Sequence, residues 1–440
     1  ASGWRHGSAE TVRVMQRVLL WYRNDLRVAD HEALHKAVRA GAQILPVYVD
    51  GATPERYELP GNPVIPGFRR KFRLESLRAL DQQWRDWNSS LVVMTGDPAE
   101  VIPQLCAKYQ INAVLLNAEA SHDEATQYKQ VAQQLQSAQV ACNVFHGAPL
   151  IHPDDLPFAL RDLPDIFTQY RKIVEARLTV RACFPTPTAV QVLPHDEAPF
   201  APVFPETIAD VRSALPFQGG EAAGQARLHD YVWKSDQLRI YKETRNGLIG
   251  TDYSSKFSAW LADGCISPRQ VFHEVRRYES ERVANDSTYW MIFELLWRDY
   301  FRLVMEKFGT ALFSLDGIAR RRTPRSWGRN SADFQAWASG NTGNRFIDAN
   351  MRELLLTGFM SNRGRQNVAS YFVHELALDW RLGAQYFEAA LVDYDVYSNW
   401  GNWAYLAGVG NDPRENRRFN ITRQADVYDP AGSYQKLWLD

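Results

Sequence analysis

The 440-residue sequence has only four cysteines, and no two of them stand at the short spacing that thiolate metal sites use. They form no disulfide framework and fit a reducing compartment. No apolar run approaches the roughly 18 residues that a membrane span needs, and no signal peptide is recognisable. We therefore expect a protein of the cytoplasm, or of an organelle after targeting, with no membrane partner.

Net charge is also nearly absent, because 50 basic residues are balanced by 51 acidic ones. The chain lacks an overall positive field, so any binding of nucleic acid must come from a local patch. Two phosphate-binding motifs are missing as well. No G-x-G-x-x-G follows the first predicted strand, and no G-x-x-x-x-G-K-[ST] occurs anywhere. The usual dinucleotide-binding and P-loop sites are thereby excluded.

One short motif points to zinc, since His31 and His35 match the spacing H-E-x-x-H. A catalytic zinc needs a third protein ligand, and the only suggestive residues, Glu55 and Glu58, lie in a stretch broken by prolines. We interpret the segment as the first helix after the first strand, with Asp30 as its N-cap, and expect no metal site.

The first third of the chain alternates strand and helix patterns, which predicts a parallel, Rossmann-like sheet covered on both faces. Strands are expected at residues 18–22, 43–49, 91–94, 113–116 and 140–145, and helices at 31–40, 68–87, 98–108 and 123–137. Asp97, followed by Pro98, is the expected N-cap of the third helix. Residues 1–13 are expected to be a leader outside the fold.

A proline-rich stretch follows, because residues 146–216 hold 11 of the 22 prolines, and we expect an extended connector there. Beyond the Gly219-Gly220 pair the pattern is helical. Helices are expected at residues 221–233, 268–281, 287–308, 346–357, 363–376 and 384–392. The predicted architecture is an α/β domain (15–146), a connector (147–218) and an all-α domain (219–440).

Tryptophan is unusually frequent, and ten of the 14 lie after residue 220. The helical half is therefore where we look for chemistry. Residues 253–258 place Ser254 and Ser258 around Lys256 ahead of a helical run, which suits a phosphate cradle. The alternative is a serine-rich helix cap with nothing bound.

Two further helical segments carry polar and aromatic residues on one face. Glu294, Trp297 and Arg298 are spaced for a half-open cavity, although a solvated Glu–Arg pair is an equally good interpretation. Asp395, Asn399 and Trp403 form a stripe four residues apart, with a polar interhelical network as the alternative.

Asn362 and Gln366 are also four residues apart, with Arg363 and Arg365 on other faces. Together these segments offer a phosphate cradle, acids, amides and indoles within a helical bundle. A flat cofactor with a diphosphate, such as a flavin dinucleotide, fits them best.

These segments resemble the photolyase/cryptochrome family, most closely its cryptochrome DASH branch. The similarity runs from Arg17 to Tyr434 through long motifs at residues 21–27, 241–247, 253–264, 294–302, 361–370 and 399–412. It implies an FAD-binding helical domain, a blue-light-absorbing chromophore and electron transfer. The cofactor-binding residues that it implies are Tyr241, Ser254, Ser255, Lys256, Phe257, Ser258, Arg298, Arg365, Asp393, Asp395 and Asn399.

The resemblance also implies a repair reaction, that of a deoxyribodipyrimidine photolyase acting on cyclobutane pyrimidine dimers in DNA. Trp403, Trp380 and Trp327 match the family's chain of three indoles, the relay through which the photoexcited flavin is reduced from the surface. Glu294 and Asn399 are further catalytic residues that the resemblance implies. The implied substrate-binding residues are Glu294, Trp297, Asn362, Gln366, Tyr405 and Arg245. Gln366 and Tyr405 replace Met and Trp of duplex-repairing relatives, which favours single-stranded DNA.

Three further expectations accompany the resemblance. A rim of arginines would contact DNA phosphates, namely Arg320, Arg321, Arg322, Arg325, Arg329, Arg414, Arg417 and Arg418. A second pigment, methenyltetrahydrofolate, is expected in the α/β domain near Glu119. The protein is expected to be a monomer. A blue-light receptor that binds DNA without significant repair is the alternative function, and a zinc hydrolase is the third hypothesis.

Overall fold

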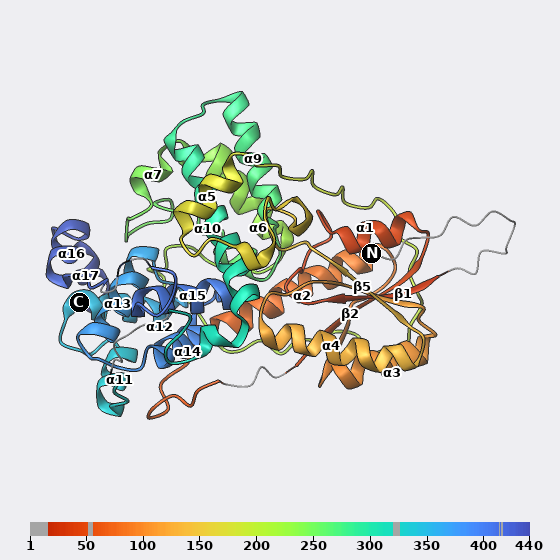
Figure 1. Cartoon of the computed structure of the whole chain (residues 1–440), viewed down its shortest axis with the longest axis horizontal. Coiled ribbons are helices and arrows are strands. Elements are labelled where there is room, and N and C mark those ends of the chain that lie inside the picture. The colour runs from red at the N-terminus through yellow and green to blue at the C-terminus, as the bar shows by residue number, and fades with distance from the viewer. Residues whose placement is uncertain (1–15, 52–55, 320–325, 413, 415–416) are drawn as a thin grey trace, which may run out of the picture.

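The computed structural model describes residues 16–51, 56–319, 326–412, 414 and 417–440. The expected leader, the zinc-ligand candidate Glu55 and the arginines 320–322 and 325 lie outside these ranges. Across the described residues, no helix combines the length and apolar character that crossing a membrane requires. The fold joins a sheet-containing part to a larger helical part (Figure 1).

A five-stranded parallel sheet forms the N-terminal part, in the order β3-β2-β1-β4-β5. Its strands are β1 (Arg17–Tyr22), β2 (Gln43–Asp50), β3 (Val92–Thr95), β4 (Ala113–Asn117) and β5 (Ala141–Phe145). The helices between them are α1 (Glu32–Arg39), α2 (Phe68–Asp86), α3 (Pro98–Tyr109) and α4 (His122–Ser137). This arrangement confirms the predicted α/β architecture, with boundaries shifted by a few residues at most.

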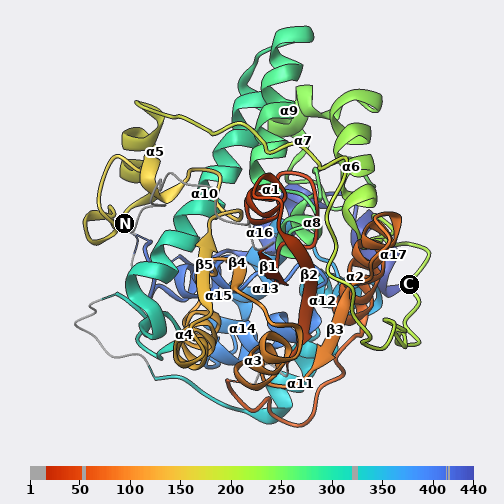
Figure 2. The same cartoon turned by 90° about the vertical axis from the view of Figure 1, so that its right-hand side faces the viewer.

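Alternation along β1 separates two cores, because successive strand side chains point to opposite faces. Leu19 and Trp21 pack with residues of α3 and α4 on one face. Val18, Leu20 and Tyr22 pack on the other face, in a core that continues through α1 and α2 into the helical part. In the view of Figure 2 the strands face the viewer and the blue C-terminal helices lie behind them. The sheet is therefore built into the helical part along one whole face.

The first helix begins differently from our expectation. Asp30 is not its N-cap; His31 is, and its Nδ1 accepts a hydrogen bond from the Leu34 amide at 3.2 Å. His31 Nε2 lies 2.9 Å from Asp25 Oδ2, so both ring nitrogens are engaged within the fold. Asp30 instead forms a buried ion pair with Arg269, whose Nη2 lies 2.9 Å from Asp30 Oδ1. The Asp97 cap is confirmed by its bond to the Ala99 amide.

The connector is not extended throughout, which corrects the sequence prediction. It contains α5 (Phe167–Glu175) and the short turns η1 (Pro153–Asp155) and η2 (Leu160–Asp162). Phe167, Tyr170 and Val174 are buried on one face of α5. Their spacing of three and four residues is the apolar stripe of a surface helix, which the many neighbouring prolines obscured.

The helical part surrounds the long helix α10 (Asp286–Phe308) and ends in a group of shorter helices around α15 (Val396–Ala407). The remaining α-helices are α6 (Glu221–His229), α7 (Tyr241–Thr244), α8 (Ser258–Ala262), α9 (Pro268–Glu281), α11 (Ser331–Ala338), α12 (Arg345–Thr357), α13 (Asn362–His374), α14 (Trp380–Ala390), α16 (Ile421–Tyr428) and α17 (Ser433–Leu439). The turns η3 (Asp230–Lys234), η4 (Gln237–Ile240) and η5 (Gly309–Phe313) complete it. Helices α7, α11, α16 and α17 were not predicted, and α14 begins four residues earlier than expected.

Candidate functional site

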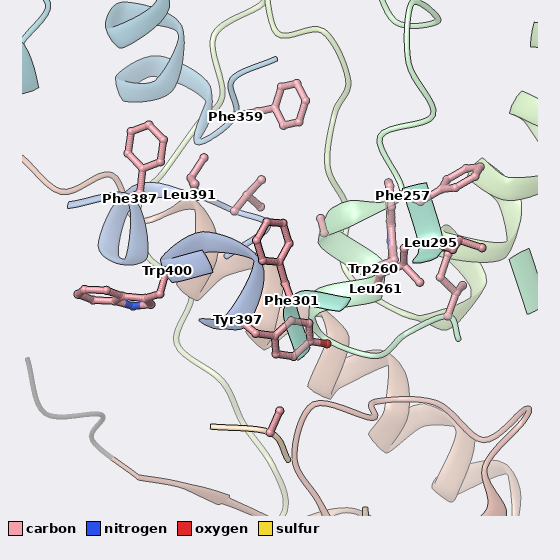
Figure 3. Close-up of a cluster of buried hydrophobic side chains, with 14 of the residues drawn as sticks. Phe257, Trp260, Leu261, Leu295, Phe301, Phe359, Phe387, Leu391, Tyr397 and Trp400 are labelled. Carbon is pink, nitrogen blue, oxygen red and sulfur yellow. The ribbon is translucent and has the colours of Figure 1, made fainter. Parts of the chain in front are cut away.

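A cavity opens between α13, α15 and the segment that joins α14 to α15. It encloses about 550 Å³, with the open solvent at its mouth included. Seven of the residues singled out from the sequence line it: Asn362, Arg365, Gln366, Asp393, Asp395, Asn399 and Trp403. Phe387 and Leu391 supply apolar surface on the α14 side (Figure 3). Two polar segments that are remote in the sequence therefore converge, and we call this space the flavin cavity.

An ion pair anchors one wall of the flavin cavity. Arg365 Nη2 lies 2.8 Å from Asp393 Oδ2, and the Ser258 hydroxyl donates to the same oxygen at 2.6 Å. Three predicted residues thus meet, from α13, from the segment after α14 and from the start of α8. The other oxygen, Asp393 Oδ1, is buried without a partner among the described residues, as is Gln366 Oε1. Two buried acceptors are therefore left for donors of a bound group.

The predicted phosphate cradle forms a tight loop around a buried lysine. Lys256 donates to the Thr251 carbonyl at 2.7 Å, and its Nζ lies 3.4 Å from the centre of the Tyr253 ring. Burial lowers the pKa of Lys256 to about 7, with a further contribution from Arg227. A buried ammonium gains from an anionic neighbour, so the loop fits a diphosphate.

Arg227 on α6 holds this loop in place and was missed by the sequence reasoning. Its guanidinium donates to the carbonyls of Thr251, Ser254 and Ser255 at 3.0–3.2 Å. On the same side, the Tyr231 ring contacts both Tyr241 and Phe257, at centroid distances of 6.4 and 5.7 Å. Its local pair with Asp230 does not reveal this role, because the loop carbonyls that Arg227 holds lie more than 20 positions away.

The stripe on α15 faces the cavity as its spacing predicted. Asp395 caps α15, accepting from the Ser398 hydroxyl at 3.0 Å and the Tyr397 amide at 3.3 Å. Burial raises the pKa of Asp395 to about 6, an effect opposed by Arg298, whose Nε lies 3.9 Å away. Asn399 donates from Nδ2 to the Ala384 carbonyl at 2.9 Å, which fixes the orientation of its amide.

Of the three predicted relay indoles, the first two are buried and the last is partly exposed. Trp403 lines the cavity and is 2% exposed, Trp380 is fully buried on α14, and Trp327 is half-buried. The Trp403 ring packs directly on the backbone of α14 at Gly383, where an added Cβ would lie 2.3 Å from it. Gly383 is one helical turn from Trp380.

The predicted substrate residues form a second group, centred on α10. Glu294 is paired with Arg245 at 2.5 Å and accepts from the Trp290 indole at 3.2 Å. Burial raises the pKa of Glu294, and Arg245 opposes that rise. The Trp297 ring makes an edge contact with Tyr405 of α15, with ring centroids 6.1 Å apart.

The Trp297 ring is also stacked on Phe167 of the connector helix α5. Their centroids are 3.6 Å apart and their planes differ by 12°. One face of Trp297 is thereby covered, and Phe301 lies nearly parallel to the same ring with centroids 5.5 Å apart, so only the remaining half-buried part of the ring is left for a base.

Three of the four described arginines of the expected phosphate rim are paired with acids. Arg417 Nε lies 2.8 Å from Asp412 Oδ2, Arg414 shares that carboxylate at 3.5 Å, and Arg418 makes a two-pronged contact with Glu375. Arg329 is exposed. The remaining predicted rim arginines lie outside the described residues.

A second, larger cavity lies between the sheet part and the helical part. It encloses about 1,900 Å³, again with solvent at its mouth, and we call it the interdomain cavity. Its charged lining residues are Arg23, Asp50, Arg56, Arg69, Arg70, Arg73, Glu119, Asp123, Glu124, Arg298, Glu388 and Asp395. Tyr394 and Asp395 border both cavities. Of this lining, the sequence reasoning named only Glu119, Arg298 and Asp395.

Two glutamates of the interdomain cavity differ in their partners. Glu119 accepts from Asn24 Nδ2 at 3.1 Å. Glu124 Oε2 is buried without a partner among the described residues, and burial together with the nearby Glu119 raises its pKa to about 7. Glu124 is thus poised to accept from a ligand donor.

The sequence matches known families over most of its length. Residues 290–440 match the family model for the FAD binding domain of DNA photolyase, and residues 18–191 match that for DNA photolyase. The cryptochrome DASH of Synechocystis sp. is 47% identical over 427 residues, covering 96% of this chain and 87% of its own. The cryptochrome DASH of Xenopus laevis is 46% identical, with coverages of 96% and 82%.

Solved structures agree with these matches. The crystal structure of Synechocystis cryptochrome superimposes with a TM-score of 0.92 at 46% identity, covering 97% of this chain and 89% of that one. A bacterial class III photolyase from Agrobacterium tumefaciens gives a TM-score of 0.82 at 26% identity, covering 98% and 88%. The fold is thus that of a family of light-absorbing flavoproteins that bind FAD and act on DNA.

The chain belongs to the photolyase/cryptochrome family and, within it, is of the cryptochrome DASH type.

Proposed function

We propose that the protein repairs cyclobutane pyrimidine dimers in single-stranded DNA by light-driven electron transfer. The observation that carries the proposal is the convergence of an anchored ion pair, two unpartnered buried acceptors and Trp403 in one cavity. When bound, FAD supplies the light absorption and the electron. The protein's own groups bind it, orient it and bring the lesion to it.

The residues that would hold FAD divide into two sets. Lys256, with the hydroxyls of Ser254 and Ser255, would face the diphosphate, since the buried ammonium gains an anionic partner there. Asp393 Oδ1 and the amide of Asn399 would meet polar edges of the isoalloxazine. Arg365 offsets the charge of Asp393, so the pair keeps that wall close to neutral.

The lesion would be received by the α10 group and by amides of α13. Trp297 would offer the part of its half-buried ring that Phe167 and Phe301 leave uncovered. Glu294, Asn362 and Gln366 would supply polar contacts, with Tyr405 and Arg245 beside them. Tyr405 offers a smaller ring than Trp for filling the gap left by a flipped base. A lesion that is already unpaired therefore suits this site best.

One observation favours the receptor as a second candidate function. Arg245 and Trp290 both engage Oε1 of the Glu294 carboxylate, so that oxygen is not available to a thymine pair while these contacts last. A protein in which this pairing persists would absorb blue light and bind DNA without repairing it.

A repair assay separates the two functions. We expect the reduced, FAD-loaded protein to restore thymine absorbance under blue light in single-stranded oligothymidylate that contains dimers, and to act more slowly on the matched duplex. Glu294→Gln, which removes the charge and keeps the shape, should reduce repair and leave the flavin spectrum unchanged. Trp337→Phe, in the same helical part, serves as the control. Flavin binding without recovery of thymine would support the receptor.

We further propose methenyltetrahydrofolate as a second pigment in the interdomain cavity. Support comes from its size and from its two glutamates, of which Glu124 has a free buried oxygen for ring N–H donors. Reconstitution tests this. The folate should bind and sensitise the flavin by energy transfer, and a failure to bind would reject this pigment without affecting the repair proposal.

We also propose that the protein acts as a monomer in the cytoplasm or in an organelle. The supporting observation for an organelle is that its Arabidopsis thaliana relative is named as chloroplastic/mitochondrial. Light scattering during gel filtration would test the oligomeric state, and a fluorescent fusion would test the compartment.

A further inference from the structure

A fourth indole lies beside the predicted relay. Trp400 is fully buried on α15 (Figure 3). It packs edge-on against Trp380, with ring centroids 5.9 Å apart and planes at 75°. It stands three residues before Trp403 on the same helix. No role in binding FAD or the lesion requires it.

Trp400 differs from neighbouring buried indoles in its hydrogen-bond acceptor. Its Nε1–H donates to the carboxylate of Glu388, at 3.0 Å from Oε2. Trp380 donates to the Leu315 carbonyl at 3.0 Å, and Trp337 donates to the Val368 carbonyl at 3.1 Å. A peptide carbonyl is too weak a base to accept the proton of an oxidised indole. A carboxylate at this distance is within reach for proton transfer.

Glu388 also has a route to solvent. It is 6% exposed and is one of the residues that line the interdomain cavity, which is open to solvent. A proton received by its carboxylate would therefore be held in a place that water can reach, close to Arg69, whose guanidinium donates to the Glu388 backbone carbonyl at 2.9 Å.

We propose that Trp400 and Glu388 form a proton-coupled branch of the indole relay, which stores the oxidising equivalent as a neutral tryptophanyl radical. This inference rests on the proposed function, because the primary oxidant is the light-excited flavin. An electron passes from the Trp400 indole to the oxidised Trp380, which returns to its neutral form. The N–H bond of the oxidised Trp400 then breaks, and its proton forms an O–H bond on Glu388.

The step is balanced within the protein and is reversible. Trp400 loses one electron and one proton, Trp380 gains the electron, and Glu388 gains the proton. Charge recombination along the relay then requires the proton to return from Glu388 to Trp400. The branch should therefore lengthen the lifetime of the charge-separated state compared with a relay of indoles bonded only to carbonyls.

Time-resolved absorption and electron paramagnetic resonance of the FAD-loaded full chain test the proposal. After a flash, the parent protein should show a fraction of deprotonated tryptophanyl radical, and its decay should slow in D₂O. Trp400→Phe should remove this fraction and shorten the radical lifetime severalfold. Glu388→Gln, which keeps an acceptor for the indole, should leave the radical in its protonated cation form. Trp337→Phe is the matched control and should behave like the parent.

The outcomes distinguish this inference from the proposed function. If the parent forms tryptophanyl radicals while Trp400→Phe leaves their spectra and lifetimes unchanged, the branch is rejected and the relay stands. If the parent forms no such radical, the relay itself fails and the branch fails with it. Flavin content and thermal unfolding verify that each variant is folded. If Glu388→Gln does not fold, the proposal is still tested by the effect of D₂O on the parent and by the radical lifetime of Trp400→Phe.

Discussion

The two cavities share a wall and differ sharply in their lining. The flavin cavity contains amides, apolar side chains and one anchored ion pair, whereas the interdomain cavity is bordered by six arginines and six acidic residues. In the first, a few fixed groups select a flat ring and set its surroundings. In the second, many opposite charges neutralise one another, and a ligand must compete with existing ion pairs. The comparison suggests that the flavin cavity is selective and that the interdomain cavity is adaptable.

The largest expected effect comes from removing the anchor of the flavin cavity. Asp393→Ala leaves Arg365 without its partner next to buried surface, which should destabilise the protein toward the lower end of ~3–5 kcal/mol because Arg365 is partly exposed. The purified variant should contain little flavin, measured as flavin absorbance per protein. The matched change in the other cavity, Asp50→Ala, breaks a more exposed pair with Arg70 and should leave flavin content intact. An equal loss of flavin from both variants would contradict the proposed difference between the two cavities.

The second effect concerns the contact between Trp403 and α14. Gly383→Ala places a methyl group against the rigid indole, and such overpacking should destabilise the fold by about 1–3 kcal/mol. Displacement of the ring should also slow photoreduction more than it lowers flavin content.

Trp403→Phe, which removes the first indole, should abolish photoreduction with FAD still bound. Normal photoreduction in either variant would count against the assigned relay.

The third effect is a pH dependence of FAD affinity. Lys256 has a pKa of about 7 without FAD, and an adjacent diphosphate favours its charged form, so binding takes up a proton at pH values above 7. Affinity, measured by flavin fluorescence titration, should therefore fall as pH rises from 7 to 9, by at most about tenfold per unit. Lys256→Arg stays charged and should show a flat profile. If the FAD affinity of the parent protein were equally independent of pH, the diphosphate would not lie next to Lys256.

The stability of the FAD-free protein should change in the opposite sense. Between pH 7 and the ordinary lysine pKa, the unfolded chain binds more protons at Lys256 than the folded one does. The free energy of unfolding should therefore rise with pH over this window, as measured by denaturant titration.

The smallest expected effect lies in the interdomain cavity. The raised pKa of Glu124, about 7, means that its ionisation opposes folding as pH rises from its ordinary value of 4.5 to 7. Glu124→Gln should thus stabilise the pigment-free protein at pH 8, by about 1 kcal/mol, and weaken folate binding. Glu119→Gln is the comparison: it removes the like charge that helps to raise the Glu124 pKa, and it should stabilise the protein less than Glu124→Gln does, because the Glu119 carboxylate has a partner in Asn24. A loss of stability in Glu124→Gln would show that its charge is compensated.

Local periodicity predicted the sheet, most helices and the α15 stripe of Asp395, Asn399 and Trp403, because each depends on spacing within one element. The resemblance to the family supplied Asp393 and Arg365. What the sequence reasoning missed depends on contacts between distant segments. Phe167 hides in a proline-rich connector, and Glu124 belongs to an ordinary amphipathic helix. Nothing in their neighbourhoods marks them, since their significance comes only from what the folded chain places opposite them.

The stacking of Phe167 on Trp297 has a consequence for how the chain can be divided. The segment that links the sheet to the helices also supports a ring of the proposed lesion-binding surface. A helical fragment that starts at Gly219 would therefore lack that support, even with its flavin-binding residues complete. When halves of two relatives are exchanged, α5 and α10 should therefore come from the same parent.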